Sequence, residues 1–162
     1  QMSLIAYHLP LDCHAEFGNN KALLDQLGLV GGQPIAEENG LLWSVPLPNA
    51  MTIDQLASQV QSALGRAPMV IESSRGSETL SRLVVCTGGA QDYLTKALYY
   101  GADVYLSGEI SERTTHEARE LGVHYIAAGH HATERYGIQA LGQKLVSTLG
   151  VDVAFFDDHN PA

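Results

Sequence analysis

The feature that most constrains the fold is the regular alternation of short apolar strands and longer helical segments in the second half of the chain. Apolar, largely β-branched runs at Arg82–Cys86, Asp103–Leu106 and Val123–Ala127 are each followed by a segment with helical periodicity. Two parallel strands need a crossover connection of about a dozen residues or more, usually a helix. The alternation therefore predicts an α/β fold, built from repeated βα units around a mostly parallel or mixed sheet.

The same reasoning extends the prediction to the rest of the chain. In the second half we expect helices at Gln91–Tyr100, Ser111–Leu121 and Thr133–Leu149, and a last strand at Val151–Phe156. In the first half we expect strands at Gln1–His8, Leu41–Leu47 and Pro68–Glu72, and helices at Asn19–Leu27 and Thr52–Leu64. Because proline cannot donate a backbone hydrogen bond, Pro46 predicts that its strand lies at a sheet edge or ends there.

A change of pattern near residue 40 predicts a boundary between two parts. Residues 1–39 are expected to form a small leading piece with its connection, and residues 40–162 a compact α/β unit. The first predicted strand begins at the first residue, without a preceding cap or turn. We therefore expect that the sequence opens in the middle of a fold.

The charge and the cysteine content exclude several classes of protein. With 18 acidic and 9 basic residues the net charge is −9, which repels a phosphate backbone, so nonspecific nucleic-acid binding is not expected. Cys13 and Cys86 are the only cysteines and lack the CxxC spacing of redox and zinc motifs. No apolar run approaches the roughly 18 residues that span a bilayer. These properties predict a cytoplasmic protein that does not associate with membranes.

The strongest candidate for chemistry is the segment Ala128–Arg135, which follows a strand and opens a helix. Parallel α/β sheets bind their ligands at the carboxyl ends of the strands. On a helix, the Cβ atoms of His130 and Glu134 lie roughly 5–6 Å apart, so the imidazole and the carboxylate can share one divalent metal ion. The alternative is that His130 caps the helix and Glu134 pairs with Arg135 or another base at the surface. His116 and Glu120 have the same spacing, but in mid-helix they indicate a solvated face.

A second candidate lies in the segment Tyr7–His14, at the end of the first predicted strand. Pro10 fixes a turn that presents Asp12, and a carboxylate at a strand end suits metal binding or base chemistry. His8 is the candidate catalytic residue. The alternative is that Asp12 forms an Asx turn and that His8 is a packed, hydrogen-bonded histidine.

Two further turns follow predicted strands. The glycines of Cys86–Ala90 would let backbone N–H groups approach an anion, although tight-turn geometry alone also explains them. Glu109 lies in the next strand-to-helix turn, where its carboxylate could face the same crevice as Glu134.

Taken together, these segments closely resemble one protein family. The resemblance is carried by YHLPLDCHAEFGNN (residues 7–20), VCTGGAQDYL (85–94), GADVYLSGEISE (101–112), TTHEARE (114–120), YIAAGHHATERYG (125–137) and the ending HNPA (159–162). The family is that of the GTP cyclohydrolase 1 type 2 homologs, related to the NGG-interacting-factor-three-like proteins. The resemblance covers essentially the whole chain.

The resemblance implies a fold and a metal site. Family members are toroidal homohexamers of two-lobed α/β subunits, with two adjacent divalent metal ions per subunit facing an internal cavity. The family's late His-x-x-x-Glu motif falls on His130 and Glu134, and its earlier aspartate ligand falls on Asp12, with His8 just upstream. His131 does not inherit a ligand role. By this resemblance, residues 1–39 are a remnant of the first lobe, and residues 40–162 are the second lobe.

One departure from the family qualifies this expectation. Family members carry a tandem histidine pair in an N-terminal segment, whereas the only His-His here is His130-His131. The chain therefore resembles the C-terminal part of a member that holds only part of the ligand set, and we expect it to be inactive by itself. For the full-length protein the resemblance implies a metal-dependent hydrolase or cyclohydrolase-like enzyme acting on a nucleotide-like small molecule. The alternative is a non-enzymatic ring-forming protein that binds metal or docks partners.

Overall fold

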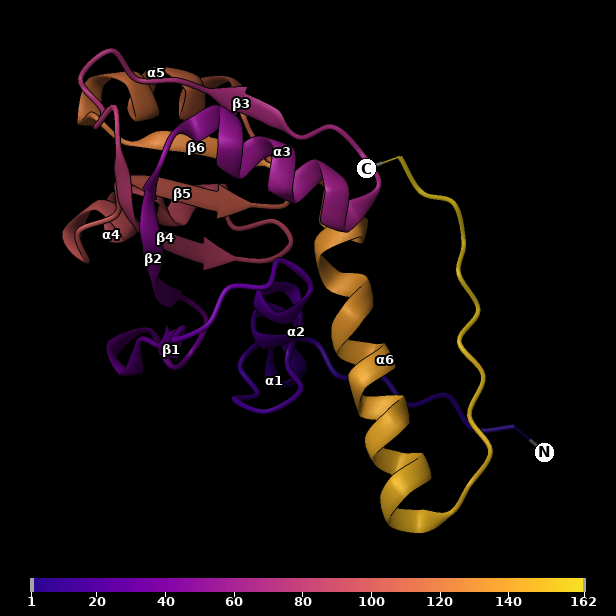
Figure 1. The fold of residues 1–162 in the computed structure, drawn as a ribbon. Coiled ribbons are helices and arrows are strands. Elements are labelled where there is room, and N and C mark those ends of the chain that lie inside the picture. The colour runs from indigo at the N-terminus through magenta and orange to yellow at the C-terminus, as the bar shows by residue number, and fades with distance from the viewer. Residues whose placement is uncertain (1, 162) are drawn as a thin grey trace.

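The computed structural model describes residues 2–161, with the side chains of residues 48–50 left out, as a mixed sheet between two layers of helices (Figure 1). Its elements are α1 (Leu9–Asp12), α2 (Asn19–Gln26), β1 (Gln33–Pro34), the 3₁₀ turn η1 (Ala36–Glu38), β2 (Trp43–Met51), α3 (Ile53–Leu64), β3 (Met69–Ile71), β4 (Leu80–Cys86), the 3₁₀ turn η2 (Gln91–Tyr93), α4 (Leu94–Tyr99), β5 (Val104–Ser107), α5 (Glu112–Leu121), β6 (His124–Ala127) and α6 (His130–Leu149).

The sheet has the strand order β1-β2-β4-β5-β6-β3. The three central strands β4, β5 and β6 are parallel, each followed by a helix, so the predicted βα units are confirmed. The outer strands are antiparallel to their neighbours, which makes the sheet mixed. The short β1 pairs only with Trp43 and Ser44, so β2 lies at the sheet edge when it reaches Pro46, as the missing N–H predicts.

Each face of the central strands packs against its own helices, because successive residues of a strand point to opposite faces. On one face, Leu83, Val85, Leu106 and Ile126 lie in a core with residues of α2 and α3. On the other, Val84, Tyr105 and Tyr125 pack against residues of α4 and α5. The helices thus cover both faces and leave the carboxyl ends of β4, β5 and β6 free to carry a site.

Two helix boundaries show how well local signals predict structure. Helix α3 begins after Thr52, whose hydroxyl accepts a hydrogen bond from the Gln55 N–H, and ends at Gly65, as expected. Helix α6, in contrast, begins at His130, so the prediction that it starts at Thr133 is wrong by three residues. The Thr133 hydroxyl donates to the Gly129 carbonyl from inside the first turn, instead of capping the helix.

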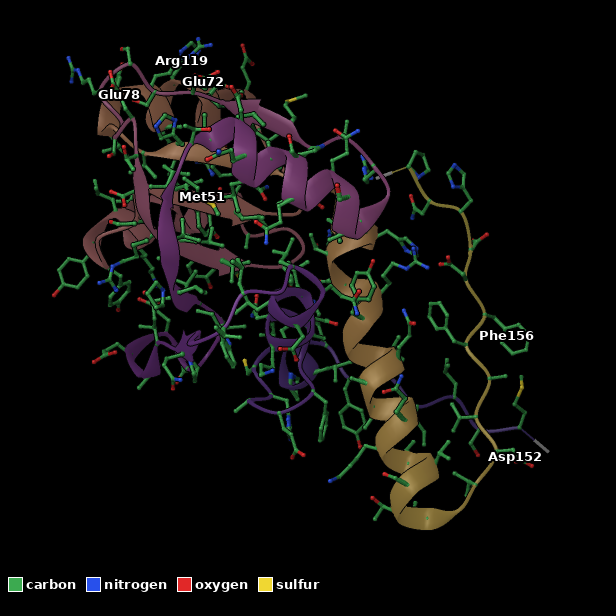
Figure 2. The ribbon with its side chains drawn as sticks, in the orientation of Figure 1. Met51, Glu72, Glu78, Arg119, Asp152 and Phe156 are labelled. Carbon is green, nitrogen blue, oxygen red and sulfur yellow. The ribbon has the colours of Figure 1, made fainter. Side chains whose placement is uncertain are left out.

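Two predicted strands are wrong in the described residues. Residues 2–8 and 150–161 form no strand, and Gln1 lies outside the described residues. The chain after α6 runs back alongside that helix without joining the sheet (Figure 1), and Figure 2 marks Asp152 and Phe156 on it. Met2 is 97% exposed and Phe156 89% exposed. An apolar, β-branched run forms a strand only where a neighbouring strand pairs with its backbone, and the sequence pattern does not specify that neighbour.

The boundary predicted near residue 40 stays a prediction. In this structure β1 joins the same sheet as the strands beyond residue 40, and α2 packs against α6. Among the described residues, no helix is long and apolar enough to cross a membrane.

Candidate metal centre

Three consecutive turns build the floor of the candidate site, one after each parallel strand. The Gly108 N–H donates to the Gly88 carbonyl at 2.9 Å, and the Gly129 N–H donates to the Gly108 carbonyl at 2.8 Å. The ladder of the sheet therefore continues into the turns. A Cβ atom at Gly108 would lie 2.8 Å from the Cα of His130, so only glycine lets this turn approach the start of α6.

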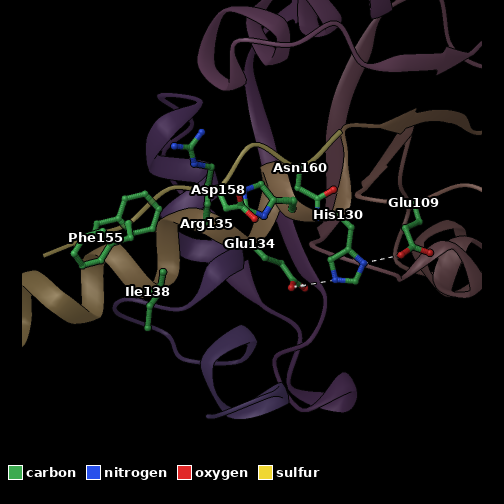
Figure 3. Close-up of a pocket in the computed structure, with 10 residues that line it drawn as sticks. Glu109, His130, Glu134, Arg135, Ile138, Phe155, Asp158 and Asn160 are labelled. Atoms are coloured by element: carbon green, nitrogen blue, oxygen red, sulfur yellow. Dashed lines mark hydrogen bonds and ion pairs between the residues drawn. The ribbon is translucent and has the colours of Figure 1, made fainter. Parts of the chain in front are cut away.

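The first turn of α6 brings the predicted pair together. His130 Nε2 lies 3.1 Å from Glu134 Oε2, and His130 Nδ1 lies 2.6 Å from an oxygen of Glu109 (Figure 3). The alternative that His130 caps the helix is wrong, because Gly129 occupies the N-cap. Arg135 forms an ion pair with Asp157, and Glu134 pairs with His130. The imidazole and the carboxylate share one face of the helix, as their spacing predicts.

The turn after β4 lies directly against this pair. Gly88 has a φ of +70°, and a Cβ atom there would lie 2.0 Å from Glu134 Oε1 and 3.1 Å from His130 Nε2. The Gly88 N–H donates to the Thr133 hydroxyl at 3.1 Å. The glycine therefore serves two needs, a left-handed backbone and space beside the carboxylate.

Asp12, near the N-terminus, lies close to the region of His130 and Glu134. It closes the short helix α1, is only 8% exposed, and accepts a hydrogen bond from the Asn19 amide at 2.6 Å. The Asn19 amide oxygen in turn accepts from the Gly137 N–H of α6, 118 positions later, at 3.1 Å. Asn20 makes a second link, because its amide donates to the Asp12 carbonyl and its oxygen accepts from the Thr87 N–H.

A cavity of about 270 Å³ joins these groups, and its walls include His8, Asp12, Thr87, His130 and Glu134. The predicted ligands Asp12, His130 and Glu134 and the candidate catalytic residue His8 thus contact one space, whereas Glu109 does not line it. Within residues 2–161, however, no group of three or more His, Cys, Asp or Glu side chains is close enough to hold a metal ion. His130 and Glu134 form a close pair, and Asp12 faces them across the cavity.

Burial and charge shift the titration of these groups. Burial, and then the negative charge of Asp12, raises the pKa of Glu134 above its usual value. Burial also raises the pKa of Asp12, although the Asn19 hydrogen bond and the nearby His8 and His130 oppose this. Burial of the His130 ring opposes protonation, yet its hydrogen bond to Glu109 and the charge of Glu134 leave its pKa raised.

The donor set fits a divalent cation. The partly buried carboxylates of Asp12 and Glu134 line the same cavity and repel each other, and a cation bound between them would offset that repulsion. Carboxylate oxygens with one imidazole nitrogen are common ligands of zinc and of other first-row divalent metals. The glycine at position 88 leaves the space that the Glu134 carboxylate itself occupies.

The neighbouring histidines have other contacts. His131 Nε2 lies 3.6 Å from an oxygen of Asp157, on the chain that follows α6. His14 Nδ1 accepts from the Glu16 N–H and its ring stacks on Phe17. Both groups lie outside the His130–Glu134 pair.

Three residues around the candidate site were not given a role from the sequence. The roles of Asn19 and Asn20 were missed because asparagines at a helix start resemble ordinary capping residues. Thr87 lies in the predicted turn Cys86–Ala90, but only the glycines of that turn were given a role, and its buried hydroxyl has no hydrogen-bond partner among the described residues. The position of these residues in a segment next to a candidate ligand was the only signal that could have found them.

A second cavity, of about 510 Å³, opens on the other side of the pair (Figure 3). Its lining includes Glu109, His130, Glu134, Arg135 and Phe155. The guanidinium carbon of Arg135 lies 5.8 Å from the centre of the Phe155 ring. The site therefore borders a space of small-molecule size whose walls carry acidic, basic and aromatic side chains.

The chain is similar to proteins of known sequence and structure over nearly its whole length. It is 48% identical to the "GTP cyclohydrolase 1 type 2 homolog" of Allochromatium vinosum over 99% of this chain and 63% of that protein. A solved structure titled protein ybgI, of unknown function, shares 42% identity with a TM-score of 0.89, over 96% of this chain and 62% of that one. The Thermus thermophilus protein TTHA1606 shares 32% identity with a TM-score of 0.85, over 96% and 60%.

The chain therefore spans somewhat less than two thirds of the length of these relatives. A family model described as Duf34/NIF3 (NGG1p interacting factor 3) matches residues 1–161. With the match covering nearly every residue, this chain belongs to the Duf34/NIF3 family.

Proposed function

We propose that this chain contributes Asp12, His130 and Glu134 to a divalent-metal site of a metal-dependent hydrolase. The observation that carries the proposal is the contact of His130 with Glu134 on α6, in a cavity that Asp12 also lines. The raised pKa values of both carboxyl groups support it, because burial disfavours their negative charges and a bound cation would compensate them.

A bound divalent cation would supply a nucleophilic hydroxide at neutral pH and would polarise a substrate oxygen. The residues of the chain have separate tasks around it. His130 and Glu134 present a nitrogen and an oxygen from one helical turn, and Asp12 presents an oxygen from α1. His8, which lines the same cavity, is placed to accept or deliver a proton.

The proposed substrate is a nucleotide-like small molecule. The cavity of about 510 Å³ beside the pair has room for a ligand of that size, and Arg135 and Phe155 offer a cation and an aromatic ring. The relatives' name, "GTP cyclohydrolase 1 type 2 homolog", agrees with a hydrolytic reaction on such a molecule. We also propose a cytoplasmic homohexamer as the assembled form, in accordance with the family resemblance.

The second candidate function is a non-enzymatic, ring-forming metal-binding or partner-docking protein. The same three ligands serve it equally well. The observation in favour of its partner-docking form is that within residues 2–161 no three metal-binding side chains lie close enough to hold an ion, which docking does not require.

An activity measurement separates the two candidates. The full-length protein is loaded with Mn²⁺, Co²⁺ or Zn²⁺, and release of phosphate or ring-opened product is followed from GTP and from simple phosphoesters. Turnover that requires metal and is lost in Glu134→Gln supports the hydrolase. Metal binding without turnover of any of these compounds contradicts it and supports the second candidate.

A further inference from the structure

We propose that Glu109 is a positioning residue, which holds the His130 ring through Nδ1 so that Nε2 is the nitrogen presented to the cavity. The proposal deepens the metal site described above, and it rests on that site for the ligand role of Nε2. The geometry of the ring itself is independent of any metal.

The contacts of the His130 ring divide its two nitrogens between two carboxylates. Nδ1 lies 2.6 Å from Glu109 Oε1, and Nε2 lies 3.1 Å from Glu134 Oε2 (Figure 3). The shorter contact is the one to Glu109, and Glu109 lies on a different segment from the helix that carries His130. The ring is therefore held from outside its own helix.

The backbone of Glu109 is held on both sides. Its N–H donates to the Gly88 carbonyl at 3.1 Å, and its carbonyl accepts from the Tyr125 hydroxyl at 2.5 Å. Tyr125 is fully buried in β6. The carboxylate also lies against the turn after β4, where a Cβ at Gly89 would be 3.4 Å from it. These contacts fix the point from which the Glu109 side chain reaches His130.

The chemistry of the pair follows from its geometry. Each ring nitrogen lies beside a carboxylate acceptor, and the contact to Glu109 is the shorter, at 2.6 Å against 3.1 Å to Glu134. The shorter contact favours the proton of a neutral His130 ring on Nδ1, which leaves the lone pair on Nε2. Metal-binding histidines commonly donate their other N–H to a carboxylate, which fixes the tautomer and raises the basicity of the ligating nitrogen. The opposite tautomer would place a proton between Nε2 and any cation.

A purely structural reading of this contact makes a different prediction. The Glu109 side chain is 46% exposed, and an exposed ion pair contributes little to stability. If Glu109 were only a surface partner, its removal would leave the tautomer of His130 and the metal affinity unchanged.

The test uses the metal-free protein first. Long-range ¹H–¹⁵N NMR spectra, recorded above the pH at which the His130 resonances stop titrating, report which nitrogen of the neutral ring carries the proton. We expect the Nδ1–H tautomer in the wild type and in Glu109→Gln, whose amide oxygen still accepts. We expect the Nε2–H form to gain population in Glu109→Ala. Glu112→Ala, which changes an exposed carboxylate on the next helix, is the control and should match the wild type.

Metal affinity is the second measurement, with Co²⁺ as the probe. Loss of such a supporting carboxylate typically costs about 10–100-fold in affinity, and we expect a loss of this size for Glu109→Ala and a smaller one for Glu109→Gln. An Nε2–H ring in the wild type, or an unchanged tautomer in Glu109→Ala, would overturn the positioning role. If Glu109 sets the tautomer but the wild type binds no Co²⁺, the positioning role stands and the proposed metal function fails.

Discussion

The Asn19 side chain joins Asp12 to helix α6, because its amide donates to the Asp12 carboxylate at 2.6 Å while its oxygen accepts from the Gly137 N–H at 3.1 Å. One buried residue thus connects the two ends of the chain that supply the candidate ligands. A Cβ atom at Gly137 would lie 2.2 Å from that Asn19 oxygen, so a small residue is required on the helix as well.

Asn19→Ala should destabilise the fold and weaken metal binding together. Breaking a buried hydrogen bond to a charged group costs about 1–3 kcal/mol, and Asp12 would lose its link to α6. The free energy of unfolding from urea titration and the Co²⁺ affinity give the two values. Lys21→Ala is the control, because Lys21 and Asp25 form only an exposed pair on the same helix. An Asn19→Ala protein with the affinity of the wild type would contradict the assigned role.

Gly88→Ala and Gly65→Ala form a matched pair of variants. Both glycines have nearly the same positive φ, +70° and +69°, but a Cβ at Gly65 would meet no atom within 4 Å. Each substitution should cost about 1–2 kcal/mol for the left-handed backbone. Gly88→Ala should cost about 1–3 kcal/mol more, because Glu134 must move. Only Gly88→Ala should lower the Co²⁺ affinity, and equal affinities of the two variants would argue against Glu134 as a ligand.

Glu134→Gln should stabilise the metal-free protein at neutral pH. Burial raises the pKa of Glu134, so the folded state favours the protonated carboxyl group. As the pH rises through the raised pKa, the group ionises in its buried position and the folded state loses stability. The variant should gain stability over the wild type above that pKa and match it below the usual value of 4.5. Urea titrations from about pH 4 to pH 8 measure the difference, and a variant that is less stable at pH 8 would contradict the prediction.

Asp103→Asn should show the opposite pH dependence. Burial opposes ionisation of Asp103, but hydrogen bonds from the Ser81 hydroxyl and the Ser81 and Arg82 N–H groups lower its pKa. The ionised Asp103 carboxylate stabilises the folded state at a pH above its usual pKa of 3.8. This stabilisation is lost as the pH falls through the lowered pKa of the folded protein. The variant should lose about 1–3 kcal/mol at neutral pH, and the loss should shrink in acid. A constant loss at all pH values would contradict this account.

The two thiols should differ in their reactivity toward a disulfide reagent. Burial, and then the charges of Asp12 and Glu134, raises the pKa of Cys86 to about 12, and Cys86 is buried. Cys13 is partly exposed, although burial also raises its pKa. In the native protein one thiol should react, that of Cys13, and Cys86 should react only after unfolding. Cys13→Ser is the control, because it should abolish the native reaction.

Much of the fold could be predicted from local sequence signals. The strands β4, β5 and β6 were identified because each is a short apolar run followed by a periodic segment, and Gly65 and Gly122 end helices where expected. The direction of β3 could not be predicted, since it depends on its partner β6 across the sheet. The same dependence explains the two predicted strands at the chain ends that the structure lacks.

The candidate site also has a part that local spacing predicts and a part that depends on contacts between distant segments. The His130–Glu134 contact follows from helical spacing alone, within four residues. The placement of Asp12 depended on resemblance to a family, because Asp12 reaches α6 only through Asn19 and the packing of α2 on α6. The hydrogen bond of Glu109 to His130 depends on how two turns pack at glycines, which no local pattern describes.

The most direct test of the account is Co²⁺ binding to the purified protein, followed by the absorption of the bound ion and by equilibrium dialysis. The account predicts binding that weakens about tenfold or more in each of Asp12→Ala, His130→Ala and Glu134→Gln. The control is the double variant His116→Ala/Glu120→Gln, which removes a pair of the same spacing on the exposed face of α5 and should bind as the wild type does. Equal affinity in all five proteins, or no binding by the wild type, would contradict the claim that these three residues form a metal site.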